Sequence, residues 1–272
     1  MSEPQWIKEA IYLYNEKHYT YKKIGEIFNT SRKTVSYYLR KNGVISNPKY
    51  VRNVNPNKLR KYDYSYCENL FKTIDTEEKA YWLGFLYADG NISKDKNVIE
   101  LSLKESDIEH LKQYRKFLNL ENKPFDYKKK CFTNDVIKYS YRFSICSANI
   151  KHDLIKLGCY PEKTYVLKFP TEKQVPSKLI HHFLRGYIDG DGCIYTSSKR
   201  ISLEVLGTFD FLNGYKKWVC LGHSKIYKFN HANVFRVINN GQHALNILNR
   251  IYDQATIYLE RKRQKYLNYI AV

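Results

Sequence analysis

The sequence predicts an α+β protein, in which a small all-α domain precedes a duplicated domain with pseudo-twofold symmetry. Apolar residues at helical spacing fill residues 1–45, and an Asn-rich stretch with two prolines follows over 46–74. Two similar segments, WLGFLYADG at 82–90 and LRGYIDGDG at 184–192, then recur at an offset of 102 residues. The recurrence indicates two copies of one unit within 75–272, over about 75–170 and 177–272.

The composition favours a polyanionic partner. Among 272 residues, 46 are Lys or Arg and 27 are Asp or Glu, so the net charge is +19, and basic surfaces release counterions from nucleic-acid phosphates. The 26 tyrosines can touch sugars and bases, although a compositional bias toward Lys and Tyr would give the same counts. No apolar run approaches the roughly 20 residues that cross a bilayer, and no signal-peptide layout is present. We therefore expect a protein that is neither secreted nor in a membrane, located in the cytoplasm or in whichever compartment holds the DNA that encodes it.

Residues 1–45 are predicted to form a helix-turn-helix domain. Thr20 and Ser31 are suitable N-caps for a second and a third helix, and Asn42-Gly43 suits the end of the third. A capped basic helix after a short turn is typical of the helix that enters the DNA major groove. The side chains expected at bases, phosphates or the DNA backbone are Arg32, Lys33, Ser36, Tyr37 and Arg40. A helical bundle that binds protein is the alternative for this domain, and the basic linker over 46–74 is either a phosphate-tracking arm or a solvated spacer.

Each copy within 75–272 has the predicted order helix, strands, helix, strands, helix. Alternating apolar and polar residues predict strands at 98–103, 139–145, 200–205 and 234–238. Apolar periodicity predicts helices at 106–118, 148–158, 208–219 and 243–251. The repeated segments end the first helix of each copy, for which Asp75 and Ser177 are the expected N-caps.

Small residues on these two first helices predict that the helices pack against each other. Glycine inside a helix costs about 1 kcal/mol relative to alanine, so its recurrence in both copies needs a reason. Small residues four apart allow two helix backbones to approach closely. The residues expected at this helix interface are Ala80, Gly84, Ala88, Gly186 and Gly190.

Close pairing brings two carboxylates together at the helix ends, because the helices end at Asp89 and Asp191. A carboxylate at a helix C-terminus faces the negative end of the helix dipole, and two neighbouring carboxylates repel each other. A divalent cation would offset both penalties, and Mg²⁺ prefers carboxylate and phosphate oxygens. Two carboxylates sharing metal at a DNA backbone suit phosphodiester hydrolysis, in which metal holds the attacking water and stabilises the leaving oxygen.

At these residues the sequence resembles the LAGLIDADG (dodecapeptide) homing endonucleases, through AYWLGFLYADG and FLRGYIDGDG over residues 75–272. The resemblance implies two αββαββα units whose sheets form a saddle over double-stranded DNA, in the two-motif type that acts as a monomer. It implies Mg²⁺ (or Mn²⁺) held by Asp89 and Asp191, with supporting contacts from the carbonyls of Ala88 and Gly190. One departure is position six of the motif, which is Tyr87 in the first copy and Asp189 in the second.

The resemblance also implies a lysine beside each metal site and DNA contacts from the sheets. By position, the lysines are Lys163 and Lys262, with Lys168 as a second candidate for the first copy. Alternation along residues 138–144 points Lys138, Ser140 and Arg142 outward, and Arg236 is the counterpart in the second copy. Such outward side chains can read base edges, with Arg favouring guanine, or can simply be solvated.

Three functions fit this sequence. The first is a site-specific homing endonuclease that makes Mg-dependent double-strand breaks and promotes mobility of its own intron or intergenic element. The second is a DNA-binding regulator that does not cut, although a binder has no use for two repelling carboxylates. The third is a maturase that binds intron RNA through the same basic saddle.

Overall fold

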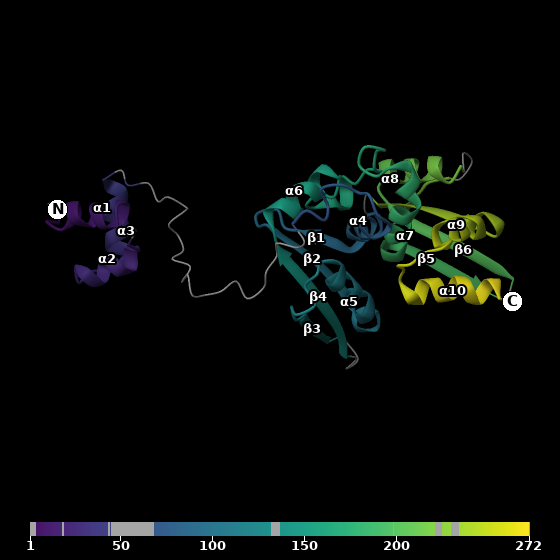
Figure 1. Cartoon of the computed structure of the whole chain (residues 1–272), viewed down its shortest axis with the longest axis horizontal. Helices are drawn as coiled ribbons and strands as arrows, with labels where there is room; N and C mark the ends of the chain where they lie inside the picture. Colours follow the sequence, from purple (N-terminus) through teal and green to yellow (C-terminus); the bar gives the residue numbers. More distant parts are fainter. Residues whose placement is uncertain are drawn as a thin grey trace. The chain divides into compact units, whose positions relative to one another are not determined.

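The computed structural model describes residues 4–17, 19–42, 44, 68–131, 137–197, 199–220, 225–229 and 234–271. The chain divides into two compact units, with the boundary near residue 61 (Figure 1). Over the described ranges, no helix combines the length and the apolar character that crossing a membrane requires.

The first unit consists of three helices, α1 (Ile7–Asn15), α2 (Tyr21–Ile27) and α3 (Arg32–Lys41). The predicted N-caps are in place: Thr20 Oγ1 accepts from Lys23 N at 3.2 Å, and Ser31 Oγ accepts from Thr34 N at 3.0 Å. Ala10, Ile24, Val35 and Leu39 are fully buried and form the centre of a small core of their own. The expected end of the third helix at Gly43 lies outside the described residues.

The second unit contains the same series of elements twice. The first copy comprises α4 (Glu77–Asp89), β1 (Gly90–Ile92), β2 (Val98–Lys104), α5 (Ile108–Phe117), β3 (Asp126–Cys131), β4 (Ile137–Cys146) and α6 (Ala148–Lys156). The second comprises α7 (Ile180–Asp191), β5 (Gly192–Ser197), β6 (Arg200–Gly207), α8 (Phe209–Trp218), β7 (Tyr227–Phe229), β8 (Val234–Asn240) and α9 (Gln242–Tyr252). A further helix, α10 (Glu260–Ile270), follows the second copy.

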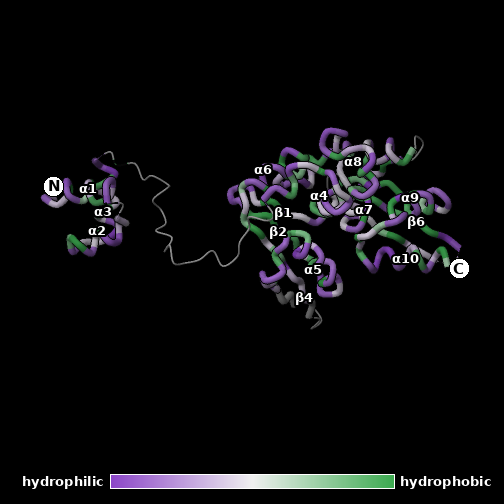
Figure 2. Tube along the Cα trace, in the orientation of Figure 1, coloured by the Kyte–Doolittle hydropathy of each residue, from purple (hydrophilic) through white to green (hydrophobic). Residues whose placement is uncertain are grey.

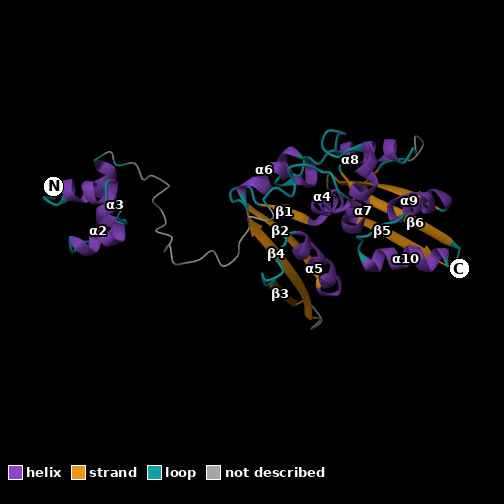
Figure 3. Cartoon of the chain, viewed as in Figure 1, coloured by secondary structure: helices purple, strands orange, loops and turns teal. Residues whose placement is uncertain are grey.

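Each copy builds one antiparallel sheet of the same topology (Figure 3). The strand orders are β1-β2-β4-β3 and β5-β6-β8-β7. The registers also correspond, because Gly90 pairs with Leu101 in the first sheet and Gly192 pairs with Val205 in the second. The predicted α+β fold with two αββαββα copies is therefore confirmed.

One face of each sheet packs on helices and on the central pair α4 and α7. Alternate strand residues such as Leu101, Phe143, Leu203 and Val237 are buried in one continuous core. Helix α4 is apolar on almost every side and α5 is amphipathic, and Figure 2 shows hydrophilic residues on the outer surface of the unit, among them several on α5. The apolar alternation of the strands therefore positions the sheets around the helix pair, and leaves their other faces polar.

Three local predictions differ from the structure. Much of the predicted linker over 46–74 lies outside the described residues, but Phe71 and Ile74 are buried in the core of the second unit. The N-cap of α4 is Thr76, which accepts from Lys79 N, while Asp75 pairs with the Lys79 ammonium at 2.7 Å. A 3₁₀ turn over Ser177–Leu179 precedes α7, and the Ser177 hydroxyl donates to Glu172 at 2.6 Å instead of capping the helix.

Candidate active site and nucleic-acid interface

Glycines bring the backbones of α4 and α7 into direct contact. A Cβ added at Gly84 would lie 1.9 Å from Phe183 O, and one added at Gly186 would lie 2.0 Å from Tyr81 O. Near the C-terminal ends, a Cβ at Gly190 would lie 2.3 Å from the Cβ of Ala88. Ala80, at the start of the same face, is fully buried. Since backbone atoms cannot move aside as a flexible side chain can, Gly84 and Gly186 accept no larger residue unless the helices separate.

The helix pair places Asp89 and Asp191 at one location. The position of a Gly190 Cβ is 3.4 Å from Asp89 Oδ2, so the carboxylate from α4 reaches the end of α7. Burial, and then the charge of Asp89, raise the pKa of Asp191 to about 6. The pKa of Asp89 is also raised by burial, against the opposing charges of Lys262 and Lys163. The side chain of Asp89 is exposed at the surface, but the surrounding protein still excludes enough water to disfavour its charged form.

A lysine binds the carbonyl oxygens at the C-terminal end of each central helix. Lys163 Nζ donates to Gly90 O, directly after α4. Lys262 Nζ donates to the carbonyls of Ile188 at 2.8 Å, Gly190 at 3.0 Å and Gly192 at 2.6 Å. Carbonyls in the last turn of a helix lack the full set of helical N–H partners, so the ammonium groups add hydrogen bonds there and offset the negative end of the dipole. Lys168, the second candidate, instead lines a hollow with Tyr165 and Thr208.

Burial makes Lys262 unlike an ordinary surface lysine. Its side chain is almost inaccessible, with 4% exposure. Burial lowers its pKa to about 8, while the charges of Asp189 and Asp89 act in the opposite direction. Lys262 therefore carries a positive charge at neutral pH and loses it at moderately alkaline pH.

The donor set at the helix ends suits a hard divalent cation. Two carboxylates and the carbonyls of Ala88 and Gly190 supply only oxygen, which Mg²⁺ prefers, and Mg²⁺ usually keeps several waters and binds substrate phosphates. Within the described ranges, no group of three or more His, Cys, Asp and Glu could hold a metal, so these residues alone form no complete metal cage. The Gly190 carbonyl already accepts from Lys262, which leaves one of its lone pairs for a cation. The remaining ligands would have to come from water or from a bound phosphate.

Asp189, which occupies position six of the second motif where the first copy has Tyr87, is the centre of a buried network that sequence patterns did not reveal. It is fully buried and accepts from Tyr81 Oη at 2.8 Å, Tyr252 Oη at 2.7 Å and Leu259 N at 2.7 Å. The corresponding Tyr87 in the first copy donates to Leu157 O. Asp189 thus fixes the chain just before α10, the helix that carries Lys262.

A buried arginine forms a second network beside the first. Arg185 is fully buried on α7 and donates to Ile257 O at 2.8 Å, to Ile251 O at 2.7 Å and to the Glu77 carboxylate of α4. A buried charge needs partners of this kind, because an unpaired one costs several kcal/mol. The pair joins the two copies directly. In the sequence, Arg185 resembled any helical arginine.

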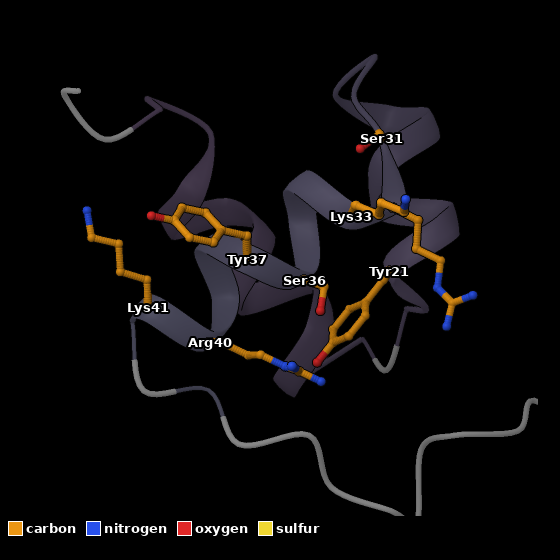
Figure 4. A pocket seen from close by; sticks show the side chains of 8 residues that line it. Tyr21, Ser31, Lys33, Ser36, Tyr37, Arg40 and Lys41 are labelled. Atoms are coloured by element: carbon orange, nitrogen blue, oxygen red, sulfur yellow. The ribbon is translucent and has the colours of Figure 1, made fainter.

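The predicted helix-turn-helix residues gather on one face of the first unit. Arg32, Lys33, Ser36, Tyr37 and Arg40 line one hollow together with Tyr21, Ser31 and Lys41 (Figure 4). The ring of Tyr37 is 61% exposed, and among the described residues of this unit no carboxylate forms an ion pair with the basic side chains that line the hollow. The face therefore combines positive charge with an exposed aromatic ring, as a phosphate-binding surface requires.

The outward residues of the sheets have ionic partners. Arg142 on β4 lies 3.4 Å from Glu100 of β2 and 3.2 Å from Asp126 of β3. Arg236 on β8 lies 3.2 Å from Glu204 of β6. Ser140 is half-buried on β4, whereas the side chain of Lys138 lies outside the described residues. The predicted outward direction of the two arginines agrees with these contacts, but no sequence pattern indicated their carboxylate partners.

Comparison with solved structures identifies the fold. The homing endonuclease I-WcaI bound to its DNA recognition sequence matches with a TM-score of 0.54 and 14% identity, over 82% of this chain and 98% of that one. The LAGLIDADG meganuclease I-AabMI bound to uncleaved DNA matches at 0.40 and 13%, over 71% and 88%. I-SmaMI bound to an uncleaved DNA target in the presence of calcium ions matches at 0.41 and 11%, over 71% and 89%. No family model matches the sequence, and neither does any curated protein. At this identity, the I-WcaI match establishes a structural similarity to the homing endonucleases and not an activity.

Proposed function

We propose that the protein is a site-specific, metal-dependent DNA endonuclease that cuts both strands of a long target. The observation that carries the proposal is the meeting of Asp89 and Asp191 at the paired ends of α4 and α7, where each carboxylate has a raised pKa. Two carboxylates are electrostatically costly in this arrangement unless a cation neutralises them. A protein that only bound DNA would gain nothing from retaining them.

Each residue of the centre has a distinct role in this proposal. Asp89 and Asp191, with the carbonyls of Ala88 and Gly190, would hold Mg²⁺ or Mn²⁺. When bound, the metal supplies positive charge to the scissile phosphate and lowers the pKa of water. Lys163 and Lys262 are fixed cations at the helix ends, and they stabilise the negative charge that develops as the phosphodiester bond breaks. The paired acids provide one carboxylate for each strand.

Charge and surface chemistry support DNA as the partner of both units. The net charge is +19, the sheets carry outward arginines, and the hollow on α3 is lined by basic residues. The second unit would bind the cleavage site as a monomer, and the helix-turn-helix would add affinity or select a neighbouring sequence. The biological role that follows is mobility of the element that encodes the protein, an intron or an intergenic insertion.

The cleavage test uses DNA that spans the intronless allele of the neighbouring gene, incubated with Mg²⁺ or with EDTA. We expect double-strand breaks only with Mg²⁺. Asp89→Asn and Asp191→Asn should each abolish cutting of both strands while DNA binding in a gel-shift assay is retained. Asp210→Asn, on the surface of α8, is the matched control and should cut normally. Cutting by either active-site variant would refute the roles assigned to the acids.

The role of the first unit is tested separately, with Lys33→Ala and Tyr37→Ala together. Both side chains line the hollow on α3, so the double variant should weaken DNA binding and leave the rate of cutting at saturating protein unchanged. The weakening should diminish as salt increases, because releasing counterions into a more concentrated salt solution gains less free energy. Unchanged binding at low salt would exclude this face as a DNA contact.

A further inference from the structure

The two sheets carry the same Arg–Glu pair at the same register position. Glu100 is paired with the second residue of β1, and Glu204 with the second residue of β5. Arg142 lies opposite the residue two positions after Glu100, and Arg236 opposite the residue two positions after Glu204. The pairs therefore occupy equivalent positions in the two copies, on the polar faces of the sheets.

The third member of this group differs between the copies. On the edge strand, the residue opposite Arg142 is Asp126, and the residue opposite Arg236 is Tyr227. Arg142 consequently has a carboxylate near each terminal nitrogen, Glu100 near Nη1 and Asp126 near Nη2. Among the described residues, Arg236 forms an ion pair with Glu204 through Nη1. Its guanidinium also lies 5.4 Å from the centre of the Phe229 ring.

The net charge and the accessible hydrogen-bonding groups therefore differ between the Arg142 group and the Arg236 group. Arg142 with Glu100 and Asp126 sums to one negative charge, and Asp126 is the most accessible member, with 62% of its side chain exposed. Arg236 with Glu204 sums to zero, and Glu204 is only 12% exposed and also accepts from Tyr195 Oη, so the arginine is the accessible group. The first group presents hydrogen-bond acceptors to solvent and the second presents donors.

We propose that these groups read opposite base chemistry in the two halves of the DNA target. Asp126 accepts from an exocyclic amino group in the major groove, which cytosine N4 and adenine N6 provide. Arg236 donates to O6 and N7 of guanine. Glu100 and Glu204 are positioning residues that hold the two guanidinium groups. This inference rests on the proposed binding of DNA by the sheets. It adds a prediction of the preferred bases at two positions of the target that lie equally far from the cut.

The test is selection of bound sequences from a randomised duplex DNA library by the full-length protein without Mg²⁺, followed by Mg²⁺ to locate the cut. The wild type should enrich cytosine or adenine on one side and guanine at the equidistant position on the other. Discrimination against other bases should be on the order of tenfold, as for other good side-chain contacts to a base.

Reciprocal variants exchange the differing residue between the copies. Asp126→Tyr should change the first preference to guanine, and Tyr227→Asp should remove the guanine preference of the second half. Both positions are exposed on edge strands, so neither change disturbs the core. Asp126→Asn is the conservative variant and should narrow the first preference to adenine, whose N6 and N7 an amide matches.

The outcomes separate this inference from the proposed function. A wild-type protein that cuts a specific target but prefers the same base at both positions overturns the inference alone. So do reciprocal variants that leave both preferences unchanged. A wild-type protein that enriches no sequence and cuts none overturns the endonuclease proposal and this inference with it.

Discussion

Replacing Asp191 by Asn should stabilise the metal-free protein while it ends DNA cleavage. The pKa of Asp191 is about 6 in the folded protein, against an ordinary value of 3.8. Between these values the folded state binds more protons than the unfolded state, so stability falls as pH rises through this window. A shift of this size corresponds to about 3 kcal/mol at neutral pH, at about 1.4 kcal/mol for each pH unit. Because water reaches the half-buried carboxylate, we expect about 1–2 kcal/mol to be recovered by the neutral amide.

Thermal unfolding in EDTA measures this gain directly. For a unit of this size, about 1–2 kcal/mol should raise the melting temperature by roughly 2–8 °C at neutral pH. The gain should shrink near pH 5, inside the window where the wild-type acid is largely protonated. Asp107→Asn is the contrasting control: Asp107 accepts from Arg261 Nε at 3.0 and 2.9 Å, so its loss should destabilise. If Asp191→Asn lowers the melting temperature at neutral pH, or raises it equally at both pH values, the electrostatic reasoning is wrong.

Three further predictions concern the same centre. The single-turnover cleavage rate should fall below about pH 6 as Asp191 is protonated, and Mg²⁺ should move this decrease to lower pH. The rate should fall again above about pH 8 as Lys262 loses its charge, and Lys262→Arg should remove this second decrease. A decrease at alkaline pH that persists in Lys262→Arg would belong to another group. Gly186→Ala should cost about 1–3 kcal/mol in urea unfolding and abolish cutting, because its Cβ would lie 2.0 Å from Tyr81 O; wild-type stability would show that the helices do not touch. Asp189→Asn should cost about 2–4 kcal/mol, because an amide offers one acceptor oxygen in place of two and adds donors beside the Leu259 N–H; a change below 1 kcal/mol would exclude a structural role for the buried acid.

Sequence patterns predicted the fold well because the relevant signals are local and repeated. Alternating strands, hydroxyl caps at Thr20 and Ser31, and the glycines at 84 and 186 each indicate structure within a short window. The duplication then made each copy a check on the other. The close approach of the two motif helices followed from side-chain size alone.

The buried polar contacts could not be predicted, because they join residues far apart in the chain. Asp189 and Leu259 are 70 residues apart, and Arg261 and Asp107 are 154 apart. Neither pair has a spacing that a sequence pattern can detect. The burial of Phe71 was missed for the opposite reason, since Leu70, Phe71 and Ile74 at the end of a polar stretch are too few to give a periodicity.

The ion pair between Glu77 and Arg185 has a consequence for how the two halves recognise each other. When the two copies are aligned on Gly84 and Gly186, the residue of the first copy that corresponds to Arg185 is Leu83. The residue of the second copy that corresponds to Glu77 is Leu179. Two first halves brought together would bury a lone acid against leucine, and two second halves would bury a lone guanidinium. Only a first half paired with a second half balances the two charges. Exchange of halves between related proteins should therefore succeed when the first half keeps the acid and the second half keeps the arginine. When the two halves are expressed separately, a first half should therefore bind a second half in preference to another copy of itself.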